Sequence, residues 1–461
     1  MTARVVQARW RCRIAVAAVL CLLAGTLAAS GALRPTTAVW TDPVYARGDV
    51  LIGTWSTPVD AVSAGGRYTC IRIEGQAWCS GEARIDIPKT GEIVNTNVMT
   101  LVQPGARGTT AITQLDTGLD QTCVVAGGAA YCWGTGGGAL GNYNPSDPFN
   151  MPPSKDPVAV YAGADDDVLF WGYQSPLYQE TVVDVFTGEQ AGCAVMDTGR
   201  AACWGLYTFL TRPVGDVPER VVSSPILVPT TAENPASQLP PGTRIQSLTT
   251  EFQNTCAVIA TGPMYCWGAN TQGQLGPPAA AAVMAPRALP RGASGTGPIT
   301  FASMGRFHLC FLSGGAAYCS GLRAAGALGD NSQTDFADEP VAVDTAGVLA
   351  GVTLTQVVTG DQFSCALSAA GRAYCWGQNS NGQLGNNLTA NSLVPVAVDM
   401  SQLPAGVTFT QIDAGTTHVC ARGSDAKVYC WGSGTSGEQA TGTNPTIVFR
   451  PQTPMTDTWT G

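Results

Sequence analysis

Residues 365–385 read CALSAAGRAYCWGQNSNGQLG, and this segment is the clearest copy of a repeated module. Two short apolar runs, each with one cysteine, flank the turn-forming residues SAAGR, which is the pattern of a β-hairpin. A polar loop rich in glycine and asparagine follows the Trp-Gly pair. The module recurs along the chain, and its first cysteine stands in turn at Cys70, Cys123, Cys193, Cys256, Cys310, Cys365 and Cys420.

The spacing of the modules indicates one sheet per repeat. The first cysteines are 53 to 55 residues apart, except for steps of 70 and 63 residues where Pro-rich insertions at 142–180 and 206–244 intervene. A period of about 50 residues with only strand and turn signals is typical of a β-propeller, whose four-stranded sheets surround an axis. The sequence therefore predicts an all-β, seven-bladed β-propeller over residues 50–461, with one four-stranded sheet per repeat.

The C-terminal residues 445–451 read PTIVFRP and precede no further hairpin. They match the strands with Pro-Val-Ala-Val at 340–343 and 395–398, which lie upstream of two hairpins. We expect this C-terminal strand to pair into the first blade and close the ring, because closure hides the exposed edge of a sheet.

Fourteen of the sixteen cysteines form pairs that are separated by nine or ten positions across a predicted turn. Opposed residues on neighbouring strands have Cβ atoms about 4.5–5.5 Å apart, and a small adjustment reaches the roughly 3.5–4.5 Å of a disulfide. Zinc sites favour shorter spacings, and buried reduced thiols are the remaining alternative. We predict the disulfides Cys70–Cys79, Cys123–Cys132, Cys193–Cys203, Cys256–Cys266, Cys310–Cys319, Cys365–Cys375 and Cys420–Cys430.

The N-terminal residues 1–33 have the pattern of an export signal, since four arginines precede an uncharged apolar run at 14–33. The run is long enough to remain as a membrane anchor, so a cleaved signal peptide and a retained anchor are both open. Residues 34–49 read as a linker. Disulfides persist in oxidising compartments, so we expect an extracytoplasmic protein, either secreted or anchored in the cell envelope.

The sequence contains few groups arranged for catalysis or metal binding. His308 and His418 stand two positions before a repeat cysteine, which favours a hydrogen-bonded strand end over catalysis, and Asp165–Asp167 lack the frame of an EF-hand. The net charge of −9 and the absence of a basic cluster beyond the N-terminus argue against nucleic acid. We predict no catalytic residue, cofactor or metal. The repeated tryptophans are expected to pack between blades: Trp133, Trp204, Trp267, Trp376 and Trp431.

The repeat, with its Gly-x-x-x-x-Cys-Ala-Leu start, its Tyr-Cys-Trp-Gly strand and its Gly-Gln-Leu-Gly end, resembles that of the regulator of chromosome condensation family. The resemblance is closest at 256–276 and 365–385, and weaker where Ser80 and Ser320 replace the tryptophan. It implies a seven-bladed propeller. The family's best-known activity is nucleotide exchange on a small nuclear GTPase, whereas a secreted bacterial inhibitor of β-lactamases uses the same propeller to bind a protein.

These observations favour an exported, non-catalytic and monomeric binding scaffold whose loops bind a protein or an envelope glycan. One alternative is a guanine-nucleotide exchange factor for a small GTPase. Another is a propeller enzyme of the lyase or glycosidase type, which would need paired carboxylates converging at one mouth of the ring.

Overall fold

The computed structural model describes residues 58–82, 96–134, 140–142, 154–160, 162, 175–189, 191–205, 222–260, 262–279, 282–440 and 447–452. They belong to the second of two units of the chain, residues 50–461. The predicted export signal, the linker and the Asp165–Asp167 triplet lie outside the described residues. Within the described ranges, no helix has the length and apolar character needed to cross a membrane.

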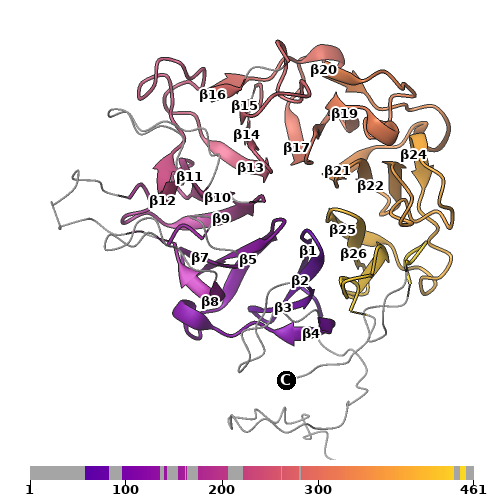
Figure 1. The fold of residues 1–461 in the computed structure, drawn as a ribbon, viewed down its shortest axis with the longest axis horizontal. Coiled ribbons are helices and arrows are strands. Elements are labelled where there is room, and N and C mark those ends of the chain that lie inside the picture. Colours follow the sequence, from indigo (N-terminus) through magenta and orange to yellow (C-terminus); the bar gives the residue numbers. More distant parts are fainter. Residues whose placement is uncertain are drawn as a thin grey trace, which may run out of the picture. The chain divides into compact units, whose positions relative to one another are not determined.

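The described residues form seven antiparallel sheets around a central axis, which confirms the predicted seven-bladed β-propeller (Figure 1). Each sheet takes its strands in chain order from the inside outward. The inner strands are β1 (Ala61–Ala64), β5 (Ile112–Thr117), β9 (Val182–Thr187), β13 (Ile245–Glu251), β17 (Ile299–Met304), β21 (Leu354–Thr359) and β25 (Phe409–Ala414). The second strands are β2 (Tyr68–Ile73), β6 (Gln121–Ala126), β10 (Ala191–Met196), β14 (Asn254–Ile259), β18 (His308–Ser313), β22 (Phe363–Ser368) and β26 (His418–Gly423).

The outer half of each blade follows the same order. The third strands are β3 (Gln76–Gly81), β7 (Ala129–Gly134), β11 (Ala201–Gly205), β15 (Tyr265–Gly268), β19 (Ala316–Leu322), β23 (Ala373–Gly377) and β27 (Val428–Gly432). The fourth strands are β4 (Thr96–Leu101), β8 (Ser154–Ala159), β12 (Val222–Leu227), β16 (Val283–Ala288), β20 (Phe336–Ala342) and β24 (Ser392–Ala397). Four short 3-10 helices lie in connections: η1 (Gly105–Arg107), η2 (Gly292–Ser294), η3 (Ala324–Gly326) and η4 (Gly347–Leu349).

The expectation that the C-terminal strand pairs into the first blade is wrong. Val448 instead pairs with Gly432 at the end of β27, and each residue donates its backbone N–H to the other's carbonyl, at 2.8 and 2.9 Å. Gly377 pairs with Ser392 in the same way in the sixth blade. The first blade already takes all four strands from residues 61–101, so its sheet offers no place for a returning strand.

The second and third strands of every blade form the predicted hairpin, and the structure joins all seven predicted cysteine pairs. Cys365 lies directly opposite Cys375 in the β22–β23 register, and the other pairs occupy the same position. The Cα atoms of each pair are 4.0–4.1 Å apart and the sulfurs are bonded. Each blade therefore carries one covalent staple between strands that neighbour in sequence.

The repeated tryptophans are fully buried and pack between blades, as expected. Trp376 Nε1 in the sixth blade donates to the carbonyl of Ala327 in the fifth, at 2.9 Å. Trp431 Nε1 reaches the carbonyl of Gln383 in the sixth blade. Ser320, which replaces the tryptophan, donates to the carbonyl of Gln274 in the preceding blade. The fifth, sixth and seventh blades are thus each hydrogen-bonded to the preceding blade, the fifth through a serine in place of the tryptophan.

Candidate functional site at the mouth of the central tunnel

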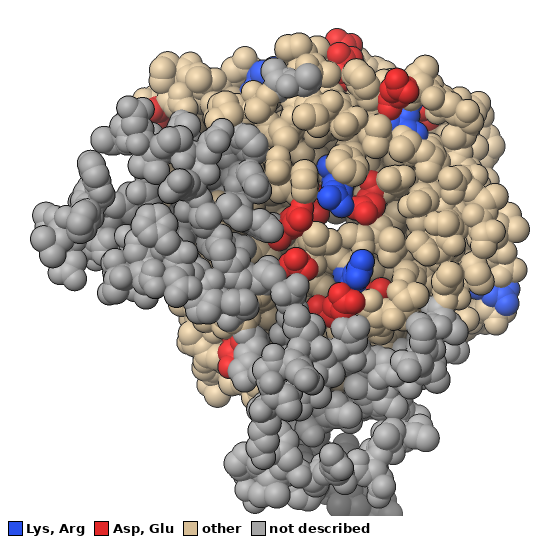
Figure 2. Space-filling model, viewed as in Figure 1, with Lys and Arg blue, Asp and Glu red and all other residues tan. Residues whose placement is uncertain are grey.

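The seven inner strands enclose a polar cavity of about 310 Å³ along the axis. One end of this tunnel is surrounded by the turns that follow the inner strands, and we call these turns the tunnel mouth. Charged side chains gather around the central opening, while most of the described face beyond it is uncharged (Figure 2). The tunnel mouth consists of residues 65–67, 118–120, 188–189, 251–253, 305–307, 360–362 and 415–417.

Six of the seven turns begin with a glycine, because neighbouring blades are crowded there. A Cβ atom on Gly65 would lie 2.6 Å from the carbonyl oxygen of Gly118 in the next blade, and a Cβ on Gly360 would lie 2.7 Å from that of Gly415. The large residue three positions later also crowds the site, since Tyr68 Cε1 would lie 2.5 Å from the Gly65 Cβ. At five of the six glycines, an added Cβ would lie 2.7 Å or less from a carbonyl oxygen of the next blade, so a side chain there would push two blades apart.

The fourth blade breaks this rule, since Glu251 stands where the other blades have glycine. The residue three positions later is the small Asn254, which pairs with Glu251 across the turn. Burial, strengthened by the carboxylates of Asp361 and Glu189, raises the pKa of Glu251 to about 8. The mouth therefore holds a carboxyl group that prefers its protonated form.

An arginine and two phenylalanines occupy the neighbouring part of the mouth. The guanidinium carbon of Arg306 lies 4.9 Å from the ring centroid of Phe252 and 5.2 Å from that of Phe307. The two rings are 6.3 Å apart and tilted by 56°. Burial raises the pKa values of Glu189 and Asp361, and Arg306 opposes the rise at both. Phe252 belongs to the fourth blade and Arg306 to the fifth, so the cluster bridges two blades.

Below the mouth, a belt of side chains connects neighbouring inner strands. Asp413 Oδ2 accepts the backbone N–H of Ala64 at 2.8 Å, and Asp116 Oδ2 accepts that of Thr187. Hydroxyls take the same role in other blades, since Thr249 Oγ1 accepts the N–H of Met304 at 2.7 Å. The seven positions of the belt are Ser63, Asp116, Phe186, Thr249, Ser303, Val358 and Asp413.

The belt carboxyls are perturbed by their surroundings. Burial, together with the nearby Asp413 carboxylate, raises the pKa of Asp116 to about 8. Burial raises the pKa of Asp413 to about 6, against the lowering effect of its hydrogen bonds from Ala64, Ala414 and Ser63. Both carboxyls thus take part in the hydrogen bonds that join neighbouring inner strands.

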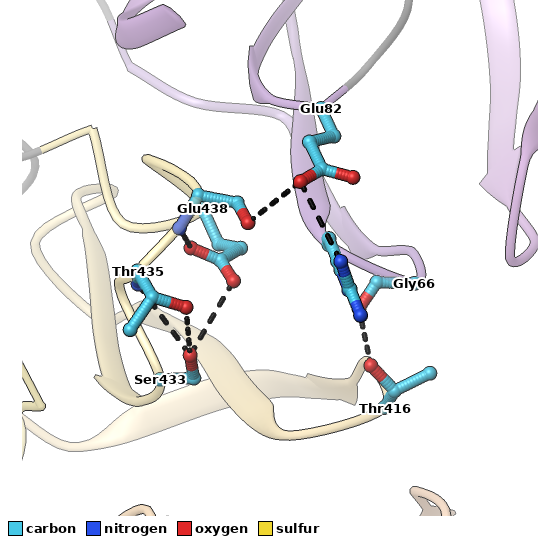
Figure 3. Close-up of polar contacts among 8 residues, drawn as sticks. Gly66, Glu82, Thr416, Ser433, Thr435 and Glu438 are labelled. Atoms are coloured by element: carbon cyan, nitrogen blue, oxygen red, sulfur yellow. Dashed lines mark hydrogen bonds and ion pairs between the residues drawn. The ribbon is translucent and has the colours of Figure 1, made fainter. Parts of the chain in front are cut away.

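Polar contacts also close the ring between the seventh and first blades (Figure 3). Thr416 Oγ1 donates to the carbonyl of Gly66 at 2.5 Å, and Ser436 Oγ donates to Glu82 Oε1 at 3.0 Å. Glu438 accepts the backbone N–H of Ser436 at 2.7 Å, just as Gln383 accepts that of Asn381 in the sixth blade. Among the described residues, side chains and a backbone hydrogen bond from the N–H of Val59 to the carbonyl of Ala426, at 2.9 Å, therefore hold this seam.

The two histidines are placed as predicted. His308 and His418 are fully buried, and their Nε2 atoms lie 2.9 Å from Ser364 Oγ and Thr69 Oγ1 of the following blade. Burial lowers the pKa of each to about 4. Both histidines hold neighbouring blades together and neither lines the tunnel.

The mouth residues were not among the candidates that the sequence motifs indicated. Aligning the repeats on their first cysteine would have revealed Glu251 as the break in a row of glycines. Nothing in the sequence marks Arg306 and Phe307, because the positions after the glycine vary from blade to blade. Among the described residues, no group of three or more His, Cys, Asp or Glu side chains is arranged to hold a metal ion.

We expect the stability of the propeller to fall as the pH rises from about 6.5 to 8. Glu251 and Asp116 keep their protons to about pH 8 in the folded chain, whereas their ordinary pKa values are 4.5 and 3.8. The folded state binds more protons in this range, so deprotonation favours unfolding. His308 and His418 act in the opposite direction, but only between about 4 and 6.5.

Glu251→Gln, which stays neutral, tests this dependence. Its melting temperature should fall by about half as much as that of the parent chain between these pH values, since Asp116 still titrates. Glu339→Gln, on the exposed part of β20, is the matched control and should behave like the parent. An unchanged pH dependence in Glu251→Gln would contradict the buried, protonated carboxyl.

The chain is similar to known repeat proteins. Two family models, both described as a regulator of chromosome condensation (RCC1) repeat, match residues 370–422 and residues 354–383 and 409–438. The ultraviolet-B receptor UVR8 of Arabidopsis thaliana is 25% identical over 387 residues, which cover 83% of this chain and 78% of the receptor. Protein RCC2 of Mus musculus is 28% identical over 202 residues, which cover 39% of this chain and 38% of RCC2.

Solved structures are similar in fold. Yeast RCC1 (Prp20), bound to Kap60, has a TM-score of 0.64 at 16% identity, over 91% of this chain and 90% of that one. Human WBSCR16 has a TM-score of 0.62 at 17% identity, over 80% of this chain and 87% of that one. At these identities the likeness shows the fold alone.

Proposed function

We propose that this propeller, whose repeats belong to the regulator of chromosome condensation family, is an exported, non-catalytic scaffold that binds a protein through the tunnel mouth. The observation that carries the proposal is the break in the repeat at this place. Glu251 replaces the glycine of the other blades, and Arg306 lies against Phe252 and Phe307. Arginine and aromatic residues are enriched where protein interfaces have their strongest contacts.

The rigidity of the ring supports a binding role. Each turn of the mouth leads into a disulfide-linked hairpin, and in five blades the inner strand before the turn carries a polar residue of the belt. A surface that is already ordered loses little conformational freedom when a partner binds. The seven disulfides and the N-terminal export pattern support a location outside the cytoplasm.

Related propellers are described with protein partners. The structure of Prp20p from Saccharomyces cerevisiae, with a TM-score of 0.63 at 17% identity, was described together with its binding to Gsp1p and histones. We carry over to this chain only the use of the ring as a protein-binding surface. A protein partner is also favoured over an envelope glycan by the paired phenylalanines and the arginine between them.

A propeller enzyme of the lyase or glycosidase type is the second candidate, because carboxyl groups do gather at one mouth. Glu251 lies close enough to Glu189 and Asp361 for their charges to raise its pKa. A carboxyl that keeps its proton near neutral pH suits a general acid. If the purified chain cleaved an envelope polysaccharide and Glu251→Gln abolished the cleavage, an enzymatic function would replace the proposed binding function.

Site-specific photo-crosslinking in the native host tests the scaffold. Benzoylphenylalanine replaces Phe252 at the mouth or, as the matched control, the exposed Phe336 on the outer strand β20. We expect one protein adduct from position 252 and none of that protein from position 336. A second mouth probe at Phe307 should capture the same protein. Adducts from the outer position alone, or no protein adduct from either mouth position, would contradict the proposal.

A further inference from the structure

We infer that the Cys420–Cys430 disulfide, at the seam between the seventh and first blades, is a site of thiol–disulfide exchange. It is the first of the seven bonds that a dithiol reductant opens in the folded chain. Cys430 is the sulfur that the reductant attacks, and Cys420 is the leaving group, which the hydroxyl of Thr69 in the first blade stabilises. The inference goes beyond the proposed function, because it concerns how the ring is held closed and not what it binds.

Access distinguishes this disulfide from the other six. Cys430 is 6% exposed, whereas every other paired cysteine is at most 1% exposed. Among the described residues, β27 is the outermost strand of the seventh sheet, while a fourth strand covers the third strand of each other blade. Cys375, for example, lies opposite Val396 of β24. Exchange requires a thiolate to reach a sulfur, so burial protects the folded chain least at Cys430.

The surroundings of Cys420 favour it as the leaving group. Thr69 Oγ1 lies 3.5 Å from Cys420 Sγ and 2.9 Å from His418 Nε2. His418 Nδ1 has no hydrogen-bond partner among the described residues, so we place the ring proton on Nε2, which donates to Thr69. The hydroxyl proton of Thr69 is then free to point at Cys420 Sγ. A hydrogen bond to a thiolate lowers the pKa of its thiol, and a thiol of lower pKa leaves faster.

The fifth blade has the same arrangement without the access. Ser364 Oγ lies 3.5 Å from Cys310 Sγ and 2.9 Å from His308 Nε2. Cys310 and Cys319 are both 0% exposed, and β20 covers β19 on its outer side. The Cys310–Cys319 pair is therefore an internal control, since it shares the hydroxyl and the histidine but is closed to a reductant.

The exchange balances in two steps. A thiolate of the dithiol bonds to Cys430 Sγ as the disulfide breaks, and the electron pair of the broken bond stays on Cys420 Sγ. The second thiolate of the reductant then displaces Cys430 from the mixed disulfide, so the reductant leaves as a cyclic disulfide. The two cysteines take up the two protons that the dithiol loses. Reduction thus removes the covalent link between β26 and β27 where Cys420 contacts the first blade.

Timed labelling of the folded full chain tests the order of opening. Dithiothreitol is added in native buffer and samples are quenched with N-ethylmaleimide. The chain is then unfolded, fully reduced and alkylated with iodoacetamide before peptide mass mapping. We expect N-ethylmaleimide on Cys420 and Cys430 at a rate at least about tenfold above that on Cys310 and Cys319. Equal rates at the two pairs, or simultaneous labelling of all seven pairs, would overturn the inference.

Glutathione in place of dithiothreitol identifies the sulfur that is attacked, because a monothiol stops at the mixed disulfide. We expect glutathione on Cys430 and N-ethylmaleimide on Cys420, and the reverse placement would show that the assignment is wrong.

Two variants test the hydroxyl. Thr69→Val removes it and should slow the opening of Cys420–Cys430 relative to that of Cys70–Cys79, which shares the strand β2 with Thr69 and reports any loosening of the blade. Thr69→Ser keeps the hydroxyl and should restore the parent's relative rate. Equal relative rates in the two variants would contradict the role of Thr69 toward the leaving group.

Discussion

Reduction of the seven disulfides is expected to leave the chain unfolded at 25 °C. Each disulfide closes a loop of about ten residues, which contributes roughly 2.7 kcal/mol in the chain-entropy model. Seven such contributions exceed the roughly 5–15 kcal/mol by which folded domains are usually stable. The native chain should resist reductant, because all fourteen cysteines are buried. Reduction in denaturant, alkylation and dilution into buffer should give a circular dichroism spectrum without β-structure.

A single disulfide provides the graded control. The double variant Cys365→Ala with Cys375→Ala lacks the bond of the sixth blade and should fold, with a stability lower by about 3 kcal/mol. A fully alkylated chain that regained the parent's spectrum and melting temperature would show that packing alone holds the blades.

Asp413→Ala is expected to destabilise the propeller by about 3 kcal/mol, because it removes hydrogen bonds between the seventh and first blades, where the ring closes. Asp413 Oδ2 accepts hydrogen bonds from the backbone N–H of Ala64 and the hydroxyl of Ser63, at 2.8 and 3.0 Å. Its loss leaves a buried N–H without a partner, and such donors cost about 1–3 kcal/mol each. Asp413→Asn keeps an acceptor oxygen and should cost about 1 kcal/mol. Thermal melting measures both variants.

Thr249→Val is the matched control inside the ring. It removes the equivalent bond to the Met304 N–H, but the fourth and fifth blades are also joined by the continuous chain. The described residues join the seventh and first blades through noncovalent contacts such as that of Asp413, so Asp413→Ala should have the larger effect. Equal melting temperatures for Asp413→Ala and the parent chain would contradict the closing role of this seam.

The repeat in the sequence was sufficient to predict the blades. Apolar runs around a turn define each hairpin, and opposed cysteines such as Cys365 and Cys375 mark the register of its two strands. The same local pattern explains why His308 and His418 were correctly assigned to structure. Trp376 and its equivalents were identified for the same reason, since a residue that recurs once per blade performs the same packing in each.

Contacts between blades could not be predicted in this way. The C-terminal strand was assigned to the wrong blade because its sequence specifies a strand but not the partner that lies closest after residue 440. The bond from Asp413 to Ala64 joins residues 349 positions apart, and no local pattern indicates it. Glu251 can be found from the sequence, because it interrupts a row of glycines in the aligned repeats. Arg306 cannot, because its role depends on its contact with Phe252 of the neighbouring blade.

The intact mass of the chain isolated from its native host tests the exported scaffold most directly, with and without reductant and thiol alkylation. We expect a mass fourteen hydrogens below that of the reduced chain, together with the loss or envelope anchoring of residues 1–33. That result would separate this propeller from an intracellular exchange factor. Fourteen free thiols on a chain that retains its N-terminal segment in the cytoplasm would contradict the account and place nucleotide exchange first among the alternatives.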